Sequence, residues 1–155
     1  MRMEILGREK TLAHVPQEQT YGIRIGFSGY CSKKSDVEDF KELENHPLYV
    51  PHVYHFDDVE PLTCEKYERP ITRDIAIQII RDFEQGKGGC SMLLVHCEEG
   101  QSRGPAVAMA LNHIFKLGAT NRELAKKYPH FNLHVAKTLG EVAEANGYGI
   151  FQAPC

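Results

Sequence analysis

No stretch of this sequence approaches the roughly 20 consecutive apolar residues that a membrane-spanning helix requires. The first residues, Met1–Glu4, do not lead into the apolar core of a secretory signal peptide. Hydrophobic residues make up 42% of the chain and charged residues 25%, which is ordinary for a globular protein in water. We therefore expect a cytoplasmic protein without a membrane partner.

Paired cysteines and clustered metal ligands are also missing. The five cysteines form an odd set without a C-x-x-C pair: Cys31, Cys64, Cys90, Cys97 and Cys155. This argues against a disulfide framework and against a structural zinc site. His46, His52 and His55 lie close in sequence, but strand alternation would put the last two on opposite faces, and no carboxylate spacing completes a ligand set. We expect neither a metal nor an organic cofactor.

The sequence has no strong charge of one sign. Its formal net charge is -3, which gives no reason to expect nucleic acid or an anionic membrane as a partner. An anionic substrate would therefore need a focused local site. The length of 155 residues suits one domain, spanning 1–155, with a complete hydrophobic core. The oligomeric state does not follow from the sequence.

Four segments read as strands, at 3–6, 21–27, 48–56 and 91–96. In the second, apolar residues alternate with others. The third contains Pro51, which favours a place at the edge of a sheet. The fourth is almost wholly apolar, which is typical of a central strand buried on both faces.

Helical spacing and capping residues predict the helices between and after these strands. Ile71, Ile75, Ile79 and Phe83 recur every fourth residue, on a helix that Thr72 would cap and that glycines 86, 88 and 89 would end. The remaining predicted helices start from a cap at Ser35, carrying Val37, Phe40 and Leu43, from a first-turn Pro105, ending at Gly118, and from caps at Asn121 and Asn132. The order predicts an α/β fold, a small central sheet flanked by helices.

The segment from His96 to Arg103 joins the buried fourth strand to the helix at Pro105. Backbone N–H groups of such a loop can turn inward and bind an anion, and the helix N-terminus adds positive charge there. Gly100 permits backbone angles that a side chain resists, and Arg103 supplies a planar fork for two phosphate oxygens. The same positive field favours the thiolate of Cys97, which can attack phosphorus and form a phosphocysteine intermediate.

These residues resemble the protein tyrosine phosphatase superfamily, whose signature is H-C-x5-R. The form H-C-x-x-G-x-S-R, with Gly100 and Ser102-Arg103, is common in dual-specificity phosphatases and their small bacterial relatives. The resemblance implies a dual-specificity-phosphatase-like fold with the phosphate-binding loop between central strand and helix. It implies that Cys97 and Arg103 are catalytic and that the loop binds substrate, through Glu98, Glu99, Gly100, Gln101, Ser102 and Arg103.

The resemblance extends to an upstream general acid. In the family an aspartate on a loop before this strand protonates the leaving oxygen and later activates water. Here Asp57 and Asp58 follow the third predicted strand; the family pattern favours Asp58, with Asp57 in reserve. The substrate would be a phosphorylated protein or a small phosphate ester, and the choice between phosphotyrosine and phosphoserine or phosphothreonine stays open.

Two positions depart from the family pattern. Gly104 replaces the usual Ser or Thr whose hydroxyl helps the thiolate leave, which predicts slow breakdown of the phosphocysteine unless Ser102 or Gln101 compensates. Glu98 and Glu99 are unusual together and would disfavour polyanionic substrates such as phosphoinositides.

Three other readings compete with a phosphatase of this type. His96-Cys97-Glu98 with Arg103-Gly104-Pro105 also resembles the active loop of rhodanese-fold phosphatases. A sulfurtransferase would use the same thiolate, carrying a persulfide. The third is a catalytically weak phosphate-binding pseudophosphatase, which Gly104 keeps open.

Overall fold

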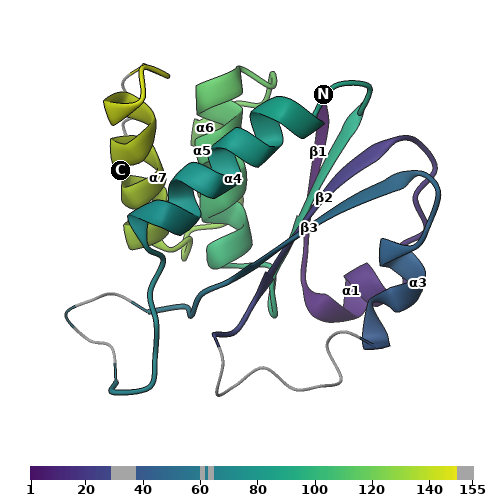
Figure 1. Ribbon diagram of the computed structural model, residues 1–155, viewed down its shortest axis with the longest axis horizontal. Helices are drawn as coiled ribbons and strands as arrows, with labels where there is room; N and C mark the ends of the chain where they lie inside the picture. The colour runs from purple at the N-terminus through teal and green to yellow at the C-terminus, as the bar shows by residue number, and fades with distance from the viewer. Residues whose placement is uncertain (29–37, 60–61, 63–64, 150–155) are drawn as a thin grey trace.

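A computed structural model describes residues 1–28, 38–59, 62 and 65–149. Four parallel strands form one sheet in the order β1-β4-β2-β3, with bounds Arg2–Leu6 for β1, Thr20–Gly26 for β2, Tyr49–His55 for β3 and Met92–His96 for β4 (Figure 1). All four strands were predicted at these places. Because they are parallel, their C-terminal ends meet at one edge of the sheet.

Strand β4 is the centre of the sheet, between β1 and β2, and all five of its residues are buried. At its C-terminal end His96 lies opposite Leu6 of β1 and Arg24 of β2. This confirms the prediction of a central strand buried on both faces. Strand β3, with Pro51 in its middle, lies at the edge of the sheet, where a missing N–H is tolerated.

Helices cover both faces of the sheet (Figure 1). One face carries the four longer helices, α4 (Arg73–Gly86), α5 (Arg103–Phe115), α6 (Asn121–Lys127) and α7 (Leu133–Ala145), and the other carries α1 (Arg8–Leu12) and α3 (Lys41–Glu44). Helix α1 was not predicted. The arrangement confirms the α/β class, a central sheet flanked by helices.

Helix α5 is the most deeply placed helix because its first ten residues, Arg103 to Asn112, are all buried. Alanines at 106, 108 and 110 let it lie against β4, β1, α6 and α7. Its N-terminus follows directly from the loop after β4. The buried helix therefore carries the positive end of its dipole to the place where the predicted phosphate loop lies.

The predicted helix caps are confirmed in part. Thr72 accepts a hydrogen bond from the Ile75 N–H (3.2 Å) and caps α4, and Asn132 accepts one from the Val135 N–H (3.0 Å) and caps α7. Helix α5 ends before Gly118, because Lys116 already takes the left-handed conformation at φ 52°.

The cap prediction at Asn121 is wrong. Thr120 is the N-cap of α6, and the Asn121 side chain turns inward, donating to the Met109 carbonyl (3.0 Å) and accepting from Asn112 Nδ2 (2.7 Å). Asn121 thus ties α6 to α5. The helix expected from Ser35 can be compared with the structure only in its second half, because Ser35 and Val37 lie outside the described residues. Phe40 is buried just before the short α3, and Leu43 is buried within it.

Candidate active site

The loop after β4 leaves the sheet at the C-terminal edge and ends at the first turn of α5. Gly100 in its middle has φ +70°, a left-handed conformation that favours glycine. The side chains of Cys97 and Arg103, at the two ends of the loop, are only 5% and 2% exposed. The segment predicted to carry chemistry therefore starts and ends inside the protein.

Two glycines hold this loop against the turn between β1 and α1. A Cβ at Gly100 would lie 2.4 Å from the Gly7 nitrogen, and a Cβ at Gly7 would lie 2.7 Å from the Glu99 carbonyl oxygen. The Arg8 N–H also donates to the Glu98 carbonyl (2.8 Å). Sequence analysis did not identify Gly7, because nothing near it in the sequence indicates this close approach.

Cys97 lies beneath the N-terminus of α5. Its Sγ accepts a hydrogen bond from the Gly104 N–H at 3.4 Å. The amide and the helix dipole both favour negative charge on the sulfur. A Cβ added at Gly104 would lie 3.4 Å from Sγ, in ordinary van der Waals contact, so a small side chain fits beside the sulfur.

Arg103 is anchored by the ends of β2 and β3. Its Nη1 donates to the carbonyls of Phe56 (2.8 Å) and Gly26 (3.4 Å), and its guanidinium lies 4.5 Å from the centroid of the Phe27 ring. Its buried Nε has no hydrogen-bond partner among the described residues. A buried donor without an acceptor is costly, and a bound oxyanion would satisfy it.

The two adjacent aspartates lie in different surroundings. Asp57 is buried and accepts hydrogen bonds from the N–H groups of Ser28 (2.9 Å) and Arg69 (2.7 Å) and from the Ser28 hydroxyl. Burial raises the pKa of Asp57, but the hydrogen bonds from Ser28 and Arg69 outweigh burial and hold the pKa below its ordinary value. The ionised Asp57 therefore holds the turn after β3 in place.

Asp58 is exposed and faces the loop. Its Oδ1 accepts hydrogen bonds from Ser102 Oγ and from Asn132 Nδ2, both at 2.7 Å. Of the predicted site residues, the structure thus brings Asp58 and Ser102 into contact at the loop that Cys97 begins and Arg103 ends. Asn132 was predicted only as a helix cap, and its second contact is a finding of the structure.

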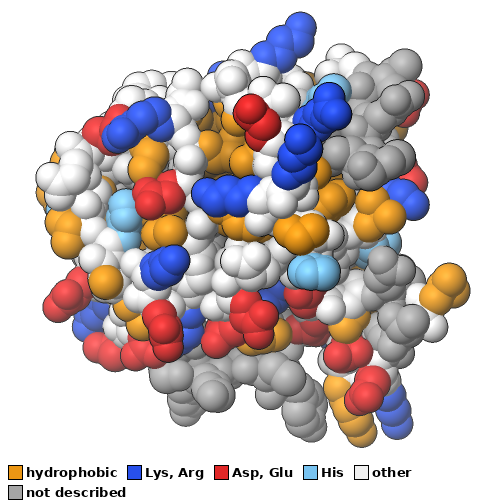
Figure 2. All heavy atoms as spheres, turned by 180° about the vertical axis from the view of Figure 1, so that it is seen from behind, with side chains coloured by type: hydrophobic (Ala, Val, Ile, Leu, Met, Phe, Trp, Pro, Cys, Tyr) orange, Lys and Arg blue, Asp and Glu red, His pale blue; other side chains and the backbone are white. Residues whose placement is uncertain are grey.

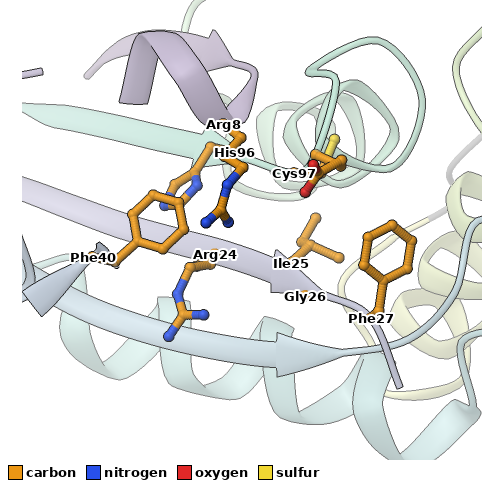
Figure 3. A pocket seen from close by; sticks show the side chains of 9 residues that line it. Arg8, Arg24, Ile25, Gly26, Phe27, Phe40, His96 and Cys97 are labelled. Carbon is orange, nitrogen blue, oxygen red and sulfur yellow. The ribbon is translucent and has the colours of Figure 1, made fainter. Parts of the chain in front are cut away.

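His96 lies on the opposite side of the loop from the Cys97 sulfur. In Figure 3 the His96 ring lies beside Phe40 and near the guanidinium of Arg8, whereas the Cys97 sulfur points away from this group. Phe40 also stacks under the guanidinium groups of Arg8 and Arg24, at 5.2 and 5.1 Å. Burial, with the charges of Arg24, His14 and Arg8, lowers the pKa of His96 to about 3. His96 is a neutral core residue.

A groove of about 830 Å³ runs along the outer edge of β1 and reaches the loop at residues 98–101. Helix α1 and the end of α6 form its other walls. Figure 2 shows the molecule from behind, where hydrophobic side chains line a hollow between charged ones. Three residues of the loop are exposed and line this groove: Glu98, Glu99 and Gln101. The loop therefore places two negative charges, those of Glu98 and Glu99, at this end of the groove.

The remaining cysteines and histidines form no second site in the described part of the chain. Cys90 precedes β4, whereas Cys97 follows it, which separates the two by about 20 Å at the rise of a strand and excludes a direct disulfide. Cys31, Cys64 and Cys155 lie outside the described residues. No cluster of three His, Cys, Asp or Glu that could hold a metal, and no helix long and apolar enough to span a membrane, is found among the residues described.

Comparison with solved structures identifies the fold. Over 92% of this chain and 90% of the other, the protein matches the crystal structure of Tk-PTP in the active form, with a TM-score of 0.51 and 17% identity. The structure of PTPMT1 in complex with PI(5)P matches with a TM-score of 0.51 and 13% identity, over 93% of this chain and 88% of that one. No protein-family model and no curated protein sequence matches. The chain has the fold of protein-tyrosine-phosphatase-like structures, as predicted.

The contact between Gly7 and the loop predicts that Gly7→Ala is destabilising. Its Cβ would meet the Glu99 carbonyl, a backbone atom that cannot step aside, and overpacking of this kind costs about 1–3 kcal/mol. Gly88→Ala is the matched control, because nothing lies within 4 Å of its Cβ. Urea unfolding of both variants measures the difference, and equal midpoints would contradict the close packing.

The buried neutral His96 predicts a loss of stability in acid. The unfolded chain takes up a proton on this histidine near its ordinary pKa of 6.5, whereas the folded protein does so only near 3. The free energy of unfolding is therefore unaffected by this group above about pH 6.5 and decreases as the pH falls below it, by ~2 kcal/mol at about pH 5. Urea unfolding across this range should show a shallower pH dependence in His96→Asn than in the wild type; parallel curves would refute the assignment.

Proposed function

We propose that this protein is a cysteine-dependent phosphate monoester hydrolase that acts through a phosphocysteine intermediate. The observation that carries the proposal is the buried Arg103. Its guanidinium is held by backbone carbonyls on one side, and its Nε has no partner in the part of the chain that the structure describes. Arg103 stands at the end of the loop that begins with Cys97. A cation, a helix N-terminus and a nucleophile meeting at one glycine-containing loop suit a phosphate monoester.

The proposed reaction begins with the phosphate held by Arg103 and by the N–H groups of residues 98–102. The Cys97 thiolate attacks phosphorus, the bond from phosphorus to the ester oxygen breaks, and Asp58 gives its proton to the departing oxygen. In the second step Asp58 takes a proton from water, whose oxygen attacks the phosphorus. The bond to sulfur breaks, which returns the thiolate and releases inorganic phosphate. Asp57 is unsuited to this role, because its oxygens are bonded to Ser28 and Arg69.

The proposed substrate is a phosphorylated protein or a small phosphate ester. Glu98 and Glu99, exposed beside the loop, favour a substrate with a single phosphate group over a polyanion. The PTPMT1 structure contains PI(5)P, so a panel of substrates should include this lipid headgroup. We propose that residues 1–155 act as one phosphatase-like domain in the cytoplasm, without a cofactor or a nucleic-acid partner.

A phosphate-binding protein with weak turnover is the second candidate. Gly104 favours it, since no side-chain hydroxyl stands next to the Cys97 sulfur at that position, and the Ser102 hydroxyl is bonded to Asp58. The fold of the structural neighbours disfavours the rhodanese-fold phosphatase and the sulfurtransferase.

Hydrolysis of an aryl phosphate by three proteins tests the proposed enzyme. Between about pH 4.5 and pH 8, a range that covers most of the pKa values of reactive thiolates, about 3.5–7.5, the wild type should be active and Cys97→Ser inactive. Asp58→Asn should lose about 10²- to 10⁴-fold in kcat, the usual contribution of a general acid. Its pH–rate profile should also lose the fall in rate on the basic side, because that fall reports the loss of the acid's proton. Asp57→Asn should instead be less stable. A wild type that binds vanadate without turnover would establish the second candidate.

The glycine after the arginine predicts that phosphocysteine accumulates. Gly104→Ser places a hydroxyl within reach of Sγ, where it can donate to the departing thiolate and speed hydrolysis of the intermediate. Gly104→Ala is the matched control, with the same Cβ and no donor. Rapid-quench trapping of the phosphoenzyme measures its breakdown. Equal breakdown rates in the serine and alanine variants would show that the missing hydroxyl does not limit this step.

A further inference from the structure

Asn132 joins three parts of the site by three hydrogen bonds. Its backbone N–H donates to the Ser102 carbonyl (3.1 Å), and its Oδ1 accepts from the Val135 N–H (3.0 Å). Its Nδ2 donates to Asp58 Oδ1 (2.7 Å). Asn132 is 9% exposed, its cap bond to Val135 is buried, and its bond to the exposed Asp58 is partly buried. One residue thus contacts the phosphate loop, caps a helix and holds the candidate acid.

Asn132 stands at the start of a helix that is packed into the core. It begins α7, whose buried residues pack against α4 and α5, and α5 in turn begins with Arg103. Asp58 itself is exposed and lies on the turn after β3. The position of its carboxyl group relative to the loop therefore depends on the two side chains that bind it, Ser102 and Asn132.

Both of these donors bind the same carboxyl oxygen. Within the described residues, Ser102 Oγ and Asn132 Nδ2 each donate to Oδ1 of Asp58. An oxygen that accepts two hydrogen bonds is the carbonyl oxygen of a carboxylic acid, because a proton on it would compete with the donors. The transferable proton is thereby assigned to Oδ2.

We propose that Asn132 is the positioning residue of the general acid, holding Oδ1 of Asp58 so that Oδ2 carries the proton to the leaving oxygen. This inference rests on the proposed function. An asparagine suits both tasks, because its oxygen caps α7 while its amide N–H₂ donates to Asp58. Serine or aspartate at this position would retain an oxygen that can cap α7. An ionised aspartate has no donor for Asp58, and the hydroxyl of serine is one bond too short to take the place of Nδ2.

The readout that isolates this role is the dependence of the rate on the leaving group. A good leaving group departs without a proton, whereas a poor one needs the acid. Asn132→Ser should therefore lose kcat/KM by about tenfold for phenyl phosphate, a small part of the general-acid contribution. For dinitrophenyl phosphate it should lose less than about twofold. Vanadate affinity should stay unchanged, since the loop is intact.

Three further variants complete the experiment. Asn132→Asp keeps the cap oxygen and replaces the donor by a second carboxylate, so it should show the same selective loss and serves if the serine variant folds poorly. Thr72→Ala weakens the cap of α4. Among the described residues the hydrogen bonds to the Asp58 side chain come from Ser102 and Asn132 and not from Thr72, so this variant should change kcat/KM for neither substrate. Asp58→Asn removes the acid itself, so its preferential loss of kcat/KM for phenyl phosphate is the upper limit for the Asn132 variants.

The outcomes separate this inference from the function on which it rests. A selective loss in Asp58→Asn together with an equal loss, or no loss, for both substrates in Asn132→Ser would overturn the role of Asn132 alone. No selective loss in Asp58→Asn, or no hydrolysis by the wild type, would overturn the proposed acid or the proposed enzyme, and the inference with it.

Discussion

The buried guanidinium of Arg103 is the interaction on which the site depends. A buried cation normally needs a carboxylate, yet Nη1 of Arg103 donates to two main-chain carbonyls and the group stacks on Phe27. Those carbonyls, of Gly26 and Phe56, stand where β2 and β3 end. No direct ion pair of Arg103 is found among the described residues, although its charge helps to lower the pKa of the buried Asp57. An anion at the loop would bind the part of the guanidinium that the carbonyls leave free.

The loop itself is held from two further sides. On one, Gly7 and Gly100 let the turn after β1 approach within backbone contact, and on the other Asn132 binds Ser102 and Asp58. Glycine is required at the first contact because backbone atoms occupy the space of a Cβ. Loops that bind phosphate through N–H groups need such support, since the groups must already point inward before the anion arrives.

The sequence predicts the parts of this account that are local. The apolar run before Cys97 predicts the buried strand, and the six-residue interval to Arg103 predicts the loop. Contacts between distant segments leave no such pattern. Asn132 and Asp58 are 74 positions apart, and Arg103 reaches the Phe56 carbonyl across 47. The cap prediction at Asn121 failed for the same reason, because the side chain that favours a cap instead bonds to α5.

A crystal structure of the protein soaked with tungstate tests the central claim most directly. We predict the oxyanion inside the loop, with a tungsten atom next to Cys97 Sγ, N–H groups of residues 98–102 donating to its oxygens, and Arg103 Nε donating to one of them. Tungstate bound only elsewhere, or a loop without bound anion at a concentration that saturates known phosphatases, would contradict the claim that this loop is a phosphate site.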